Sequence, residues 1–128
     1  MYLRLLRARA RIGALTLAAA SWPAYAHHGG AVEWQQSVHG PVTGFATDFA
    51  FRFPHVTVFI DVSTDGATEN WAVTTRWTPT ILRQHGWTRN SIKPGDTVTA
   101  TYAPHVTNST VVQMRTIEVN GDELPLQF

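Results

Sequence analysis

The chain has 128 residues, with ten lysine and arginine residues against nine aspartate and glutamate residues, and it contains no cysteine. The length fits one domain with a modest core. The missing cysteine excludes disulfides, thiolate metal sites and the covalent attachment of c-type haem.

The first segment in chain order has the three parts of a secretory signal peptide. A basic leader with four arginines precedes an apolar, uncharged run over residues 12–21, and Ala24-Tyr25-Ala26 follows as a small-x-small cleavage motif. A membrane-spanning helix needs about 20 apolar residues, and this run has roughly half that length. We therefore expect residues 1–26 to be cleaved, and the product to be periplasmic or secreted without stable insertion into the membrane.

Cleavage would change the sign of the net charge. Four of the ten basic residues lie in the leader, whereas all nine acidic residues follow it, so the exported chain is acidic. A nucleic-acid-binding protein needs a basic face that neutralises phosphates. The six remaining cations are scattered along the chain instead. We therefore predict no nucleic-acid partner.

Residues 27–40 are expected to form an arm ahead of a β domain over residues 41–128. From Gly40 onward, apolar and polar residues alternate with the period of half-buried strands. The second strand is the clearest, because its two faces separate well. One face carries Val56, Val58, Ile60 and Val62, and the other carries His55, Thr57, Phe59 and Asp61. We therefore expect His55 to point away from the core.

The neighbouring strands are expected over residues 41–49 and 70–76. A turn rich in Asp, Gly and Thr over residues 63–69 should join the second strand to the third. The fourth and fifth strands are expected over residues 97–102 and 110–119. No clear pattern marks the tail over residues 122–128.

A short helix is predicted between the third and fourth strands. Thr78 suits the N-cap, Pro79 suits the first helical position and Gly86 suits the position just past the end. Five strands with one helix in this place follow the order of the OB-fold. A small Greek-key sandwich is the alternative, but it usually needs about seven strands. The predicted fold class is therefore all-β, a small five-stranded OB-like barrel.

The order of several short motifs resembles a family of small exported bacterial proteins that is catalogued as a domain of unknown function. The resemblance implies an exported, barrel-shaped domain, and it covers essentially the whole chain after the leader. Phe53 stands where that family commonly has Asn. The motifs are Ala26-His27-His28-Gly29, Gly40-Pro41-Val42-Thr43-Gly44, Phe53-Pro54-His55, Asn70-Trp71-Ala72-Val73, Gly86-Trp87-Thr88 and Lys93-Pro94-Gly95-Asp96.

All six histidines follow the leader, and two of them would begin the exported chain. His27 would then carry a free α-amine beside its imidazole, and these nitrogens can chelate one metal ion. Nitrogen ligands of this kind favour copper(II). His28 would support the site, and His55 or His105 would complete it, each within a Pro-His-Val-Thr tetrapeptide whose proline restricts the local backbone. Copper is therefore the candidate cofactor.

Each histidine also has an interpretation without metal. The N-terminal pair can be an unbound start of the exported chain. His55 and His105 can be loop residues that only form hydrogen bonds. His85 complements the C-terminus of the expected helix, and His39 beside Gly40-Pro41 fits a turn.

The tryptophans suggest a second hypothesis. Trp71 is in phase with Val73 and is expected in the core, while Trp77 and Trp87 bracket the helix and should pack it onto the barrel. The pattern predicts no role for Trp34. OB-folds can stack ligands on exposed aromatics. The alternative function is therefore a metal-free binding module for a small molecule, a glycan or a protein partner.

The sequence offers little support for an enzyme. It contains no Gly-x-Ser-x-Gly elbow, no phosphate-binding loop and no pair of histidines four residues apart for a zinc helix. The carboxylates that lie near one another fall in expected turns. We therefore favour a binding function over an enzyme, with an oxidative copper enzyme that uses the N-terminal histidine as the remote alternative.

Overall fold

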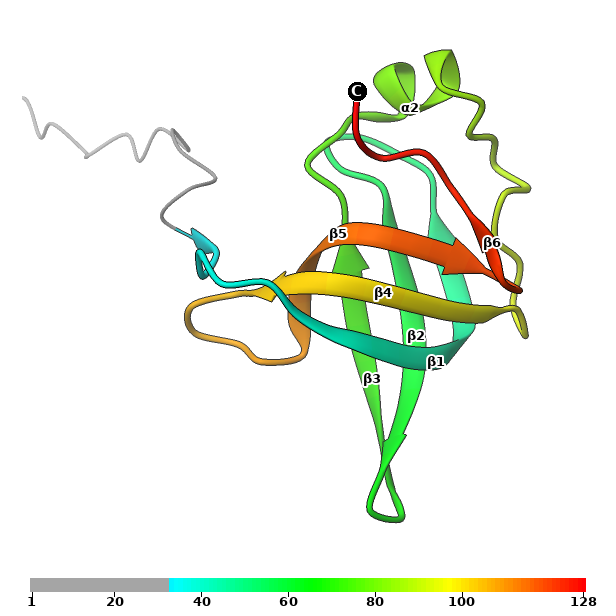
Figure 1. Ribbon diagram of the computed structural model, residues 1–128. Helices are drawn as coiled ribbons and strands as arrows, with labels where there is room; N and C mark the ends of the chain where they lie inside the picture. The colour runs from blue at the N-terminus through cyan, green and yellow to red at the C-terminus, as the bar shows by residue number, and fades with distance from the viewer. Residues whose placement is uncertain (1–32) are drawn as a thin grey trace, which may run out of the picture.

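A computed structural model describes residues 33–128. The expected signal peptide, residues 1–26, and the expected ligands His27 and His28 lie outside the described residues. The described part is a six-stranded sheet that curls into a barrel, with one short helix at one end (Figure 1). Within this part, no helix has the length and apolar character needed to cross a membrane.

Five strands close the ring. Their order is β3-β2-β1-β4-β5, and a parallel pairing of β3 with β5 joins the two ends. The helix α2 lies between β3 and β4 in the chain, which is the order predicted for an OB-like barrel. A short sixth strand pairs with the end of β5. The bounds are β1 His39–Ala50, β2 Thr57–Thr64, β3 Ala67–Thr74, α2 Pro79–Gln84, β4 Thr97–Pro104, β5 Val111–Val119 and β6 Asp122–Glu123.

The core lies inside the ring and follows the predicted alternation. Val56, Val58 and Ile60 are fully buried, whereas His55 is exposed, as expected for opposite faces of the second strand. On β1, Val42, Gly44 and Ala46 are buried between exposed neighbours. The period-two pattern therefore identified the inward face of these strands correctly.

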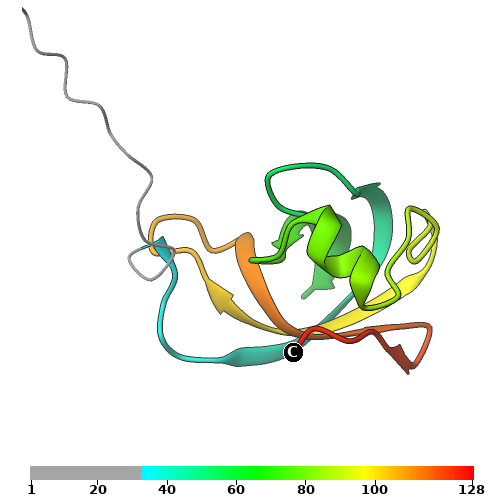
Figure 2. The same ribbon diagram turned by 90° about the horizontal axis from the view of Figure 1, so that it is seen from above.

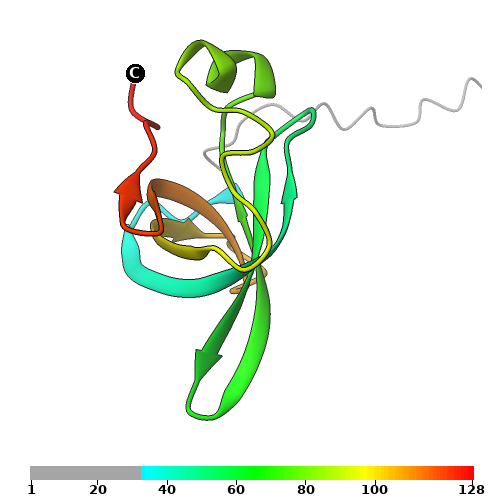
Figure 3. The same cartoon turned by 90° about the vertical axis from the view of Figure 1, so that its right-hand side faces the viewer.

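The turn between β2 and β3 is shorter than the sequence predicted. Only Asp65 and Gly66 form it, both with positive φ, of 52° and 81°. β3 therefore spans Ala67–Thr74 rather than residues 70–76. The residues around the turn are exposed on both faces, so no hydrophobic alternation marks the strands there. The Asp-Gly turn instead sets the register, and the hairpin projects from the barrel (Figures 1 and 3).

The helix forms where its predicted capping residues place it. The Thr78 side chain accepts a hydrogen bond from the Ile81 main-chain nitrogen, Pro79 begins the helix, and Gly86 follows it with φ of 89°. Leu82 on the helix and Trp87 just after it are buried in the core. Seen from above, α2 lies across one end of the ring (Figure 2).

The C-terminal tail is held by two indoles. The Nε1 atom of Trp77 donates to the Leu126 carbonyl oxygen at 3.0 Å, and the Nε1 atom of Trp87 donates to the Pro125 carbonyl oxygen at 2.7 Å. Leu126 itself is buried in the core. The two tryptophans therefore pack the helical end, as predicted, and also hold a tail whose sequence showed no pattern.

Candidate functional site

A cleft of about 490 Å³ opens where β1 begins and β4 ends. Its walls include His39, Trp71, Tyr102 and His105, together with the loop that follows β4. Because the cleft contains two of the histidines and two large aromatic rings, it is the best candidate for a functional site in the described residues.

Strand pairing brings these side chains together. His39 pairs with Tyr102 across β1 and β4. Ala72, next to Trp71, pairs with Val111, whose carbonyl oxygen accepts a hydrogen bond from the His105 main-chain nitrogen at 2.9 Å. Three separate strand contacts therefore converge on the cleft. His39, which the sequence suggested as a turn residue, is the first residue of β1.

Aromatic contacts line the cleft. The His39 ring stacks on Tyr102 with centroids 6.0 Å apart, and Trp71 meets Tyr102 edge to face at 5.4 Å. Trp71 is only half-buried, so it packs against the core and also lines the cleft. The predicted core position of Trp71 is therefore only partly correct, because the ring also borders the cleft.

The start of the described chain is attached to the same place. Trp34 forms an isolated β-bridge with His105, and their rings meet edge to face at 5.4 Å. Gln35 donates a main-chain hydrogen bond to Pro104, and Val106 donates one to Glu33, each at 2.9 Å. This contact explains Trp34, for which the sequence predicted no role. The sequence could not indicate this role, because His105, the partner of Trp34, lies some 70 residues further along the chain.

Hydrogen bonds orient both cleft imidazoles. Thr107 approaches the Nδ1 atom of His105 with its main-chain nitrogen at 3.2 Å and its hydroxyl at 3.0 Å. The Ser37 hydroxyl lies 2.8 Å from the Nε2 atom of His39. Among the described residues, the opposite ring nitrogens, Nε2 of His105 and Nδ1 of His39, have no hydrogen-bond partner. Because the Thr107 main-chain N–H donates to Nδ1 of His105, Nε2 of the neutral His105 ring is a donor, whereas the roles of the two His39 nitrogens depend on its tautomer.

The other described histidines lie elsewhere. His55 is exposed in the loop between β1 and β2, and the next residue, Val56, is hydrogen-bonded to Trp77 near the helix. His85 stacks on Phe128 at 3.4 Å. The structure thus groups His105 with His39 rather than with His55. Within residues 33–128, no group of three or more His, Cys, Asp or Glu side chains could hold a metal ion.

The fold and the cleft define a small OB-like barrel with an aromatic, histidine-containing cleft at the attachment point of its N-terminal arm. A family model described as "Family of unknown function (DUF6152)" matches residues 14–113, and the chain belongs to that family. The match confirms membership in a family of unknown function. No curated protein matches the sequence.

Proposed function

We propose that this protein is exported, is cleaved after Ala26, and binds copper(II) in the periplasm or outside the cell through its new N-terminus. His27 would chelate the ion with its α-amine and imidazole, and His28 would support it. The observation that carries the proposal is the attachment of the arm beside His105, which brings the start of the described chain to a cleft that already contains two histidines.

Chain length makes this arrangement feasible. His27 is six residues before Glu33, whose carbonyl oxygen is hydrogen-bonded to the residue after His105. An extended chain spans at most about 3.5 Å per residue, so the reach from Glu33 is about 20 Å. A site that combines the free terminus with the cleft is within that limit.

The cleft offers suitable nitrogen ligands. The Thr107 main-chain N–H donates to Nδ1 of His105, so the proton of the neutral ring is on Nε2; coordination through Nε2 would move that proton to Nδ1, break the main-chain bond and leave the Thr107 hydroxyl as its acceptor. Ser37 can likewise accept from Nε2 of His39 and leave Nδ1 for the metal. Such outer hydrogen bonds orient metal-binding histidines in many proteins. His105 is therefore the first folded partner in the proposal, His39 the second, and His55 the alternative.

The same cleft supports a second candidate function, a metal-free binding module. Its volume is in the usual range for small-ligand sites. Trp71, Tyr102 and His39 supply rings against which a sugar or a planar molecule could stack. In this alternative, the histidines donate or accept hydrogen bonds and the N-terminus has no role.

Copper(II) titration followed by paramagnetic resonance tests the proposal. Protein beginning at His27 should bind one ion with a nitrogen-rich spectrum, and protein with one extra residue ahead of His27 should lose that signal, because the α-amine becomes an amide. Equal, weak binding by both forms would overturn the proposal and favour the metal-free module.

Three histidine variants identify the folded partner. His105→Ala and His39→Ala should change the spectrum and weaken binding, whereas His55→Ala should leave both unchanged because His55 is outside the cleft. If only His55→Ala alters the spectrum, the partner lies in the loop between β1 and β2, and the cleft has no part in copper binding.

A further inference from the structure

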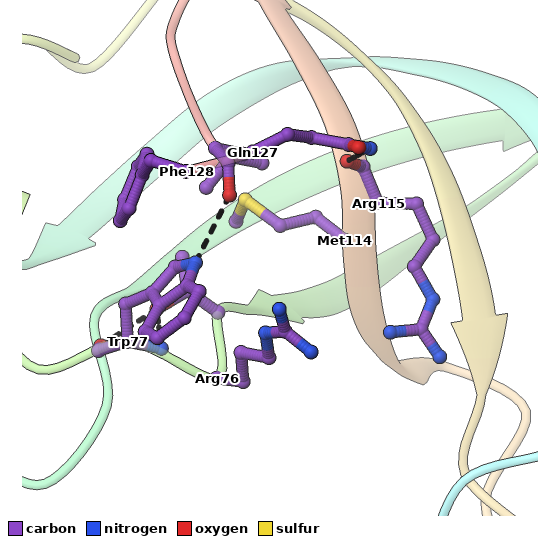
Figure 4. A pocket seen from close by; sticks show the side chains of 8 residues that line it. Arg76, Trp77, Met114, Arg115, Gln127 and Phe128 are labelled. Atoms are coloured by element: carbon purple, nitrogen blue, oxygen red, sulfur yellow. Dashed lines mark hydrogen bonds between the residues drawn. The ribbon is translucent and has the colours of Figure 1, made fainter.

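A second cavity, of about 320 Å³, lies between the end of β3, the middle of β5 and the C-terminal tail. It shares no lining residue with the cleft that contains His39 and His105. Figure 4 shows its main side chains, Arg76, Trp77, Met114, Arg115, Gln127 and Phe128. It is therefore a separate site, and its chemistry is independent of copper binding at the N-terminus.

The barrel closure explains why two arginines line this cavity. β3 and β5 run parallel, and their last paired residues are Thr74 and Gln113. Arg76 and Arg115 each lie two residues further along, just beyond the point where the pairing stops, Arg76 exposed and Arg115 half-buried. The backbone of β3 turns away toward the helix at this point, and the cavity occupies the resulting gap. Both arginines line it.

Neither guanidinium is neutralised by a carboxylate of the described chain. Arg76 lies over the Trp77 ring at 4.5 Å from its centroid. Arg115 donates to the side-chain oxygen of Gln113 at 2.9 Å. These contacts orient the two groups without using all of their donors, since each guanidinium carries five N–H groups. Although the described chain contains nine acidic residues, none of them forms an ion pair with Arg76 or Arg115, and both arginines line the same cavity.

The rest of the wall is mixed, with Thr75 and Gln127 supplying polar groups and the other side chains supplying apolar surface. Trp77, Met114 and Leu126 line the cavity beside the arginines, and Met114 and Leu126 also belong to the core. The indole nitrogen of Trp77 is bonded to the Leu126 carbonyl oxygen, the Arg76 guanidinium lies over its ring and Phe128 stacks on it at 5.1 Å, so these contacts already occupy much of the ring. A ligand that fits such a wall carries a charged end and an apolar body.

We propose that this cavity binds a small organic carboxylate. The guanidiniums of Arg76 and Arg115 hold the carboxylate, because a planar guanidinium fork matches the geometry of its two oxygens. The hydrocarbon or aromatic part of the ligand lies against Met114 and Leu126, next to Trp77. Binding is therefore selective for an amphiphilic acid over both a neutral analogue and a simple inorganic anion.

Benzoate is the probe, with benzamide as its neutral analogue and inorganic phosphate as the anion without an apolar body. Titration of the purified protein is followed by the indole N–H resonances in nitrogen–proton correlation spectra, where Trp77 reports on the cavity. Benzoate should shift the Trp77 resonance saturably, and benzamide should not. Equal binding of benzoate and benzamide, or of benzoate and phosphate, would overturn the proposal.

The variants Arg76→Gln and Arg115→Gln should each weaken benzoate binding by about tenfold, the usual loss for one charge-assisted contact. Arg83→Gln is the matched control, because Arg83 also stacks on an aromatic ring, Phe51 at 5.1 Å, but lies outside the cavity. The Arg83→Gln variant should bind benzoate as tightly as the unsubstituted protein does. Arg76→Lys keeps the charge and loses the fork, so intermediate affinity is expected.

Dispersed spectra of each variant establish that it is folded before its affinity is compared. If folded Arg76→Gln and Arg115→Gln bind benzoate as tightly as the Arg83→Gln control does, the two arginines do not hold the ligand, and the proposal is wrong.

Discussion

The indole ring of Trp34 meets the imidazole of His105 edge to face, with centroids 5.4 Å apart and planes at 87°. The two residues are also joined by a β-bridge, although about 70 positions separate them in the chain. This contact connects the arm to the candidate site. His105 lines the cleft, and Trp34 belongs to the arm that precedes β1.

Trp34→Ala should detach the start of the arm. The edge-to-face contact of such a pair is worth about 1 kcal/mol beyond simple burial, so a loss of that order in unfolding free energy is expected. The amides of Gln35 and Val106 should also exchange faster with deuterium, since their hydrogen bonds join the arm to the loop after β4. Trp34→Phe keeps an aromatic edge and serves as the control. Unchanged exchange in Trp34→Ala would show that the main-chain bonds suffice.

The two indoles that hold the tail should contribute differently to stability. Trp87 is 1% exposed, so Trp87→Phe removes buried ring volume from the core as well as the donor to the carbonyl oxygen of the exposed Pro125. The lost core packing costs on the order of 1–3 kcal/mol. Trp77 is only half-buried, so Trp77→Phe removes less buried volume and should cost less. Urea unfolding of both variants measures the difference, and a larger loss for Trp77→Phe would contradict the prediction.

Gly44→Ala should strongly destabilise the barrel. A Cβ atom at this position would lie 2.5 Å from the carbonyl oxygen of Asp61 on the neighbouring strand, so β1 and β2 would have to separate. We expect a loss of about 2–3 kcal/mol, as for other overpacked positions. Gly66→Ala is the comparison, because Gly66 has positive φ but open space around it, and the strain there is about 1–2 kcal/mol. Denaturant unfolding of both variants gives the ranking, and an equal loss would show that β1 relieves most of the clash by shifting.

Asp96 should contribute to stability in a pH-dependent way. The side-chain amide of Asn120 donates to it at 3.0 Å and the Lys93 main-chain nitrogen at 2.8 Å, and these bonds lower the pKa of Asp96 below its ordinary value of 3.8. A carboxylate whose pKa is lower in the folded state stabilises the fold above the unfolded pKa. That contribution is lost as the pH falls from about 4 through the lower, folded value.

Asn120→Gly tests this relationship, because glycine tolerates the positive φ of 52° at this turn while the amide donor is removed. The pKa of Asp96, followed by carbon NMR of its carboxyl group, should rise toward 3.8. A pKa that does not move would mean that the Lys93 amide alone sets it.

Local patterns predicted several elements correctly. The alternating residues around Val58 defined a half-buried strand, and the capping residues Thr78, Pro79 and Gly86 defined the helix. These signals succeed because each depends only on neighbours within a few residues. The turn at Asp65-Gly66 was predicted too long, since exposed strands on both sides of it have no apolar face to reveal their length.

The sequence alone therefore determined the inward face of the central strands, the position of the helix and the order of elements in an OB-like barrel. Only the tertiary structure decided which distant side chains meet. The pairing of β1 with β4 places His39 beside Tyr102, and the parallel pairing of β3 with β5 brings Arg76 and Arg115 to the wall of one cavity. Such neighbours depend on strand register between segments tens of residues apart, and no local periodicity encodes that register.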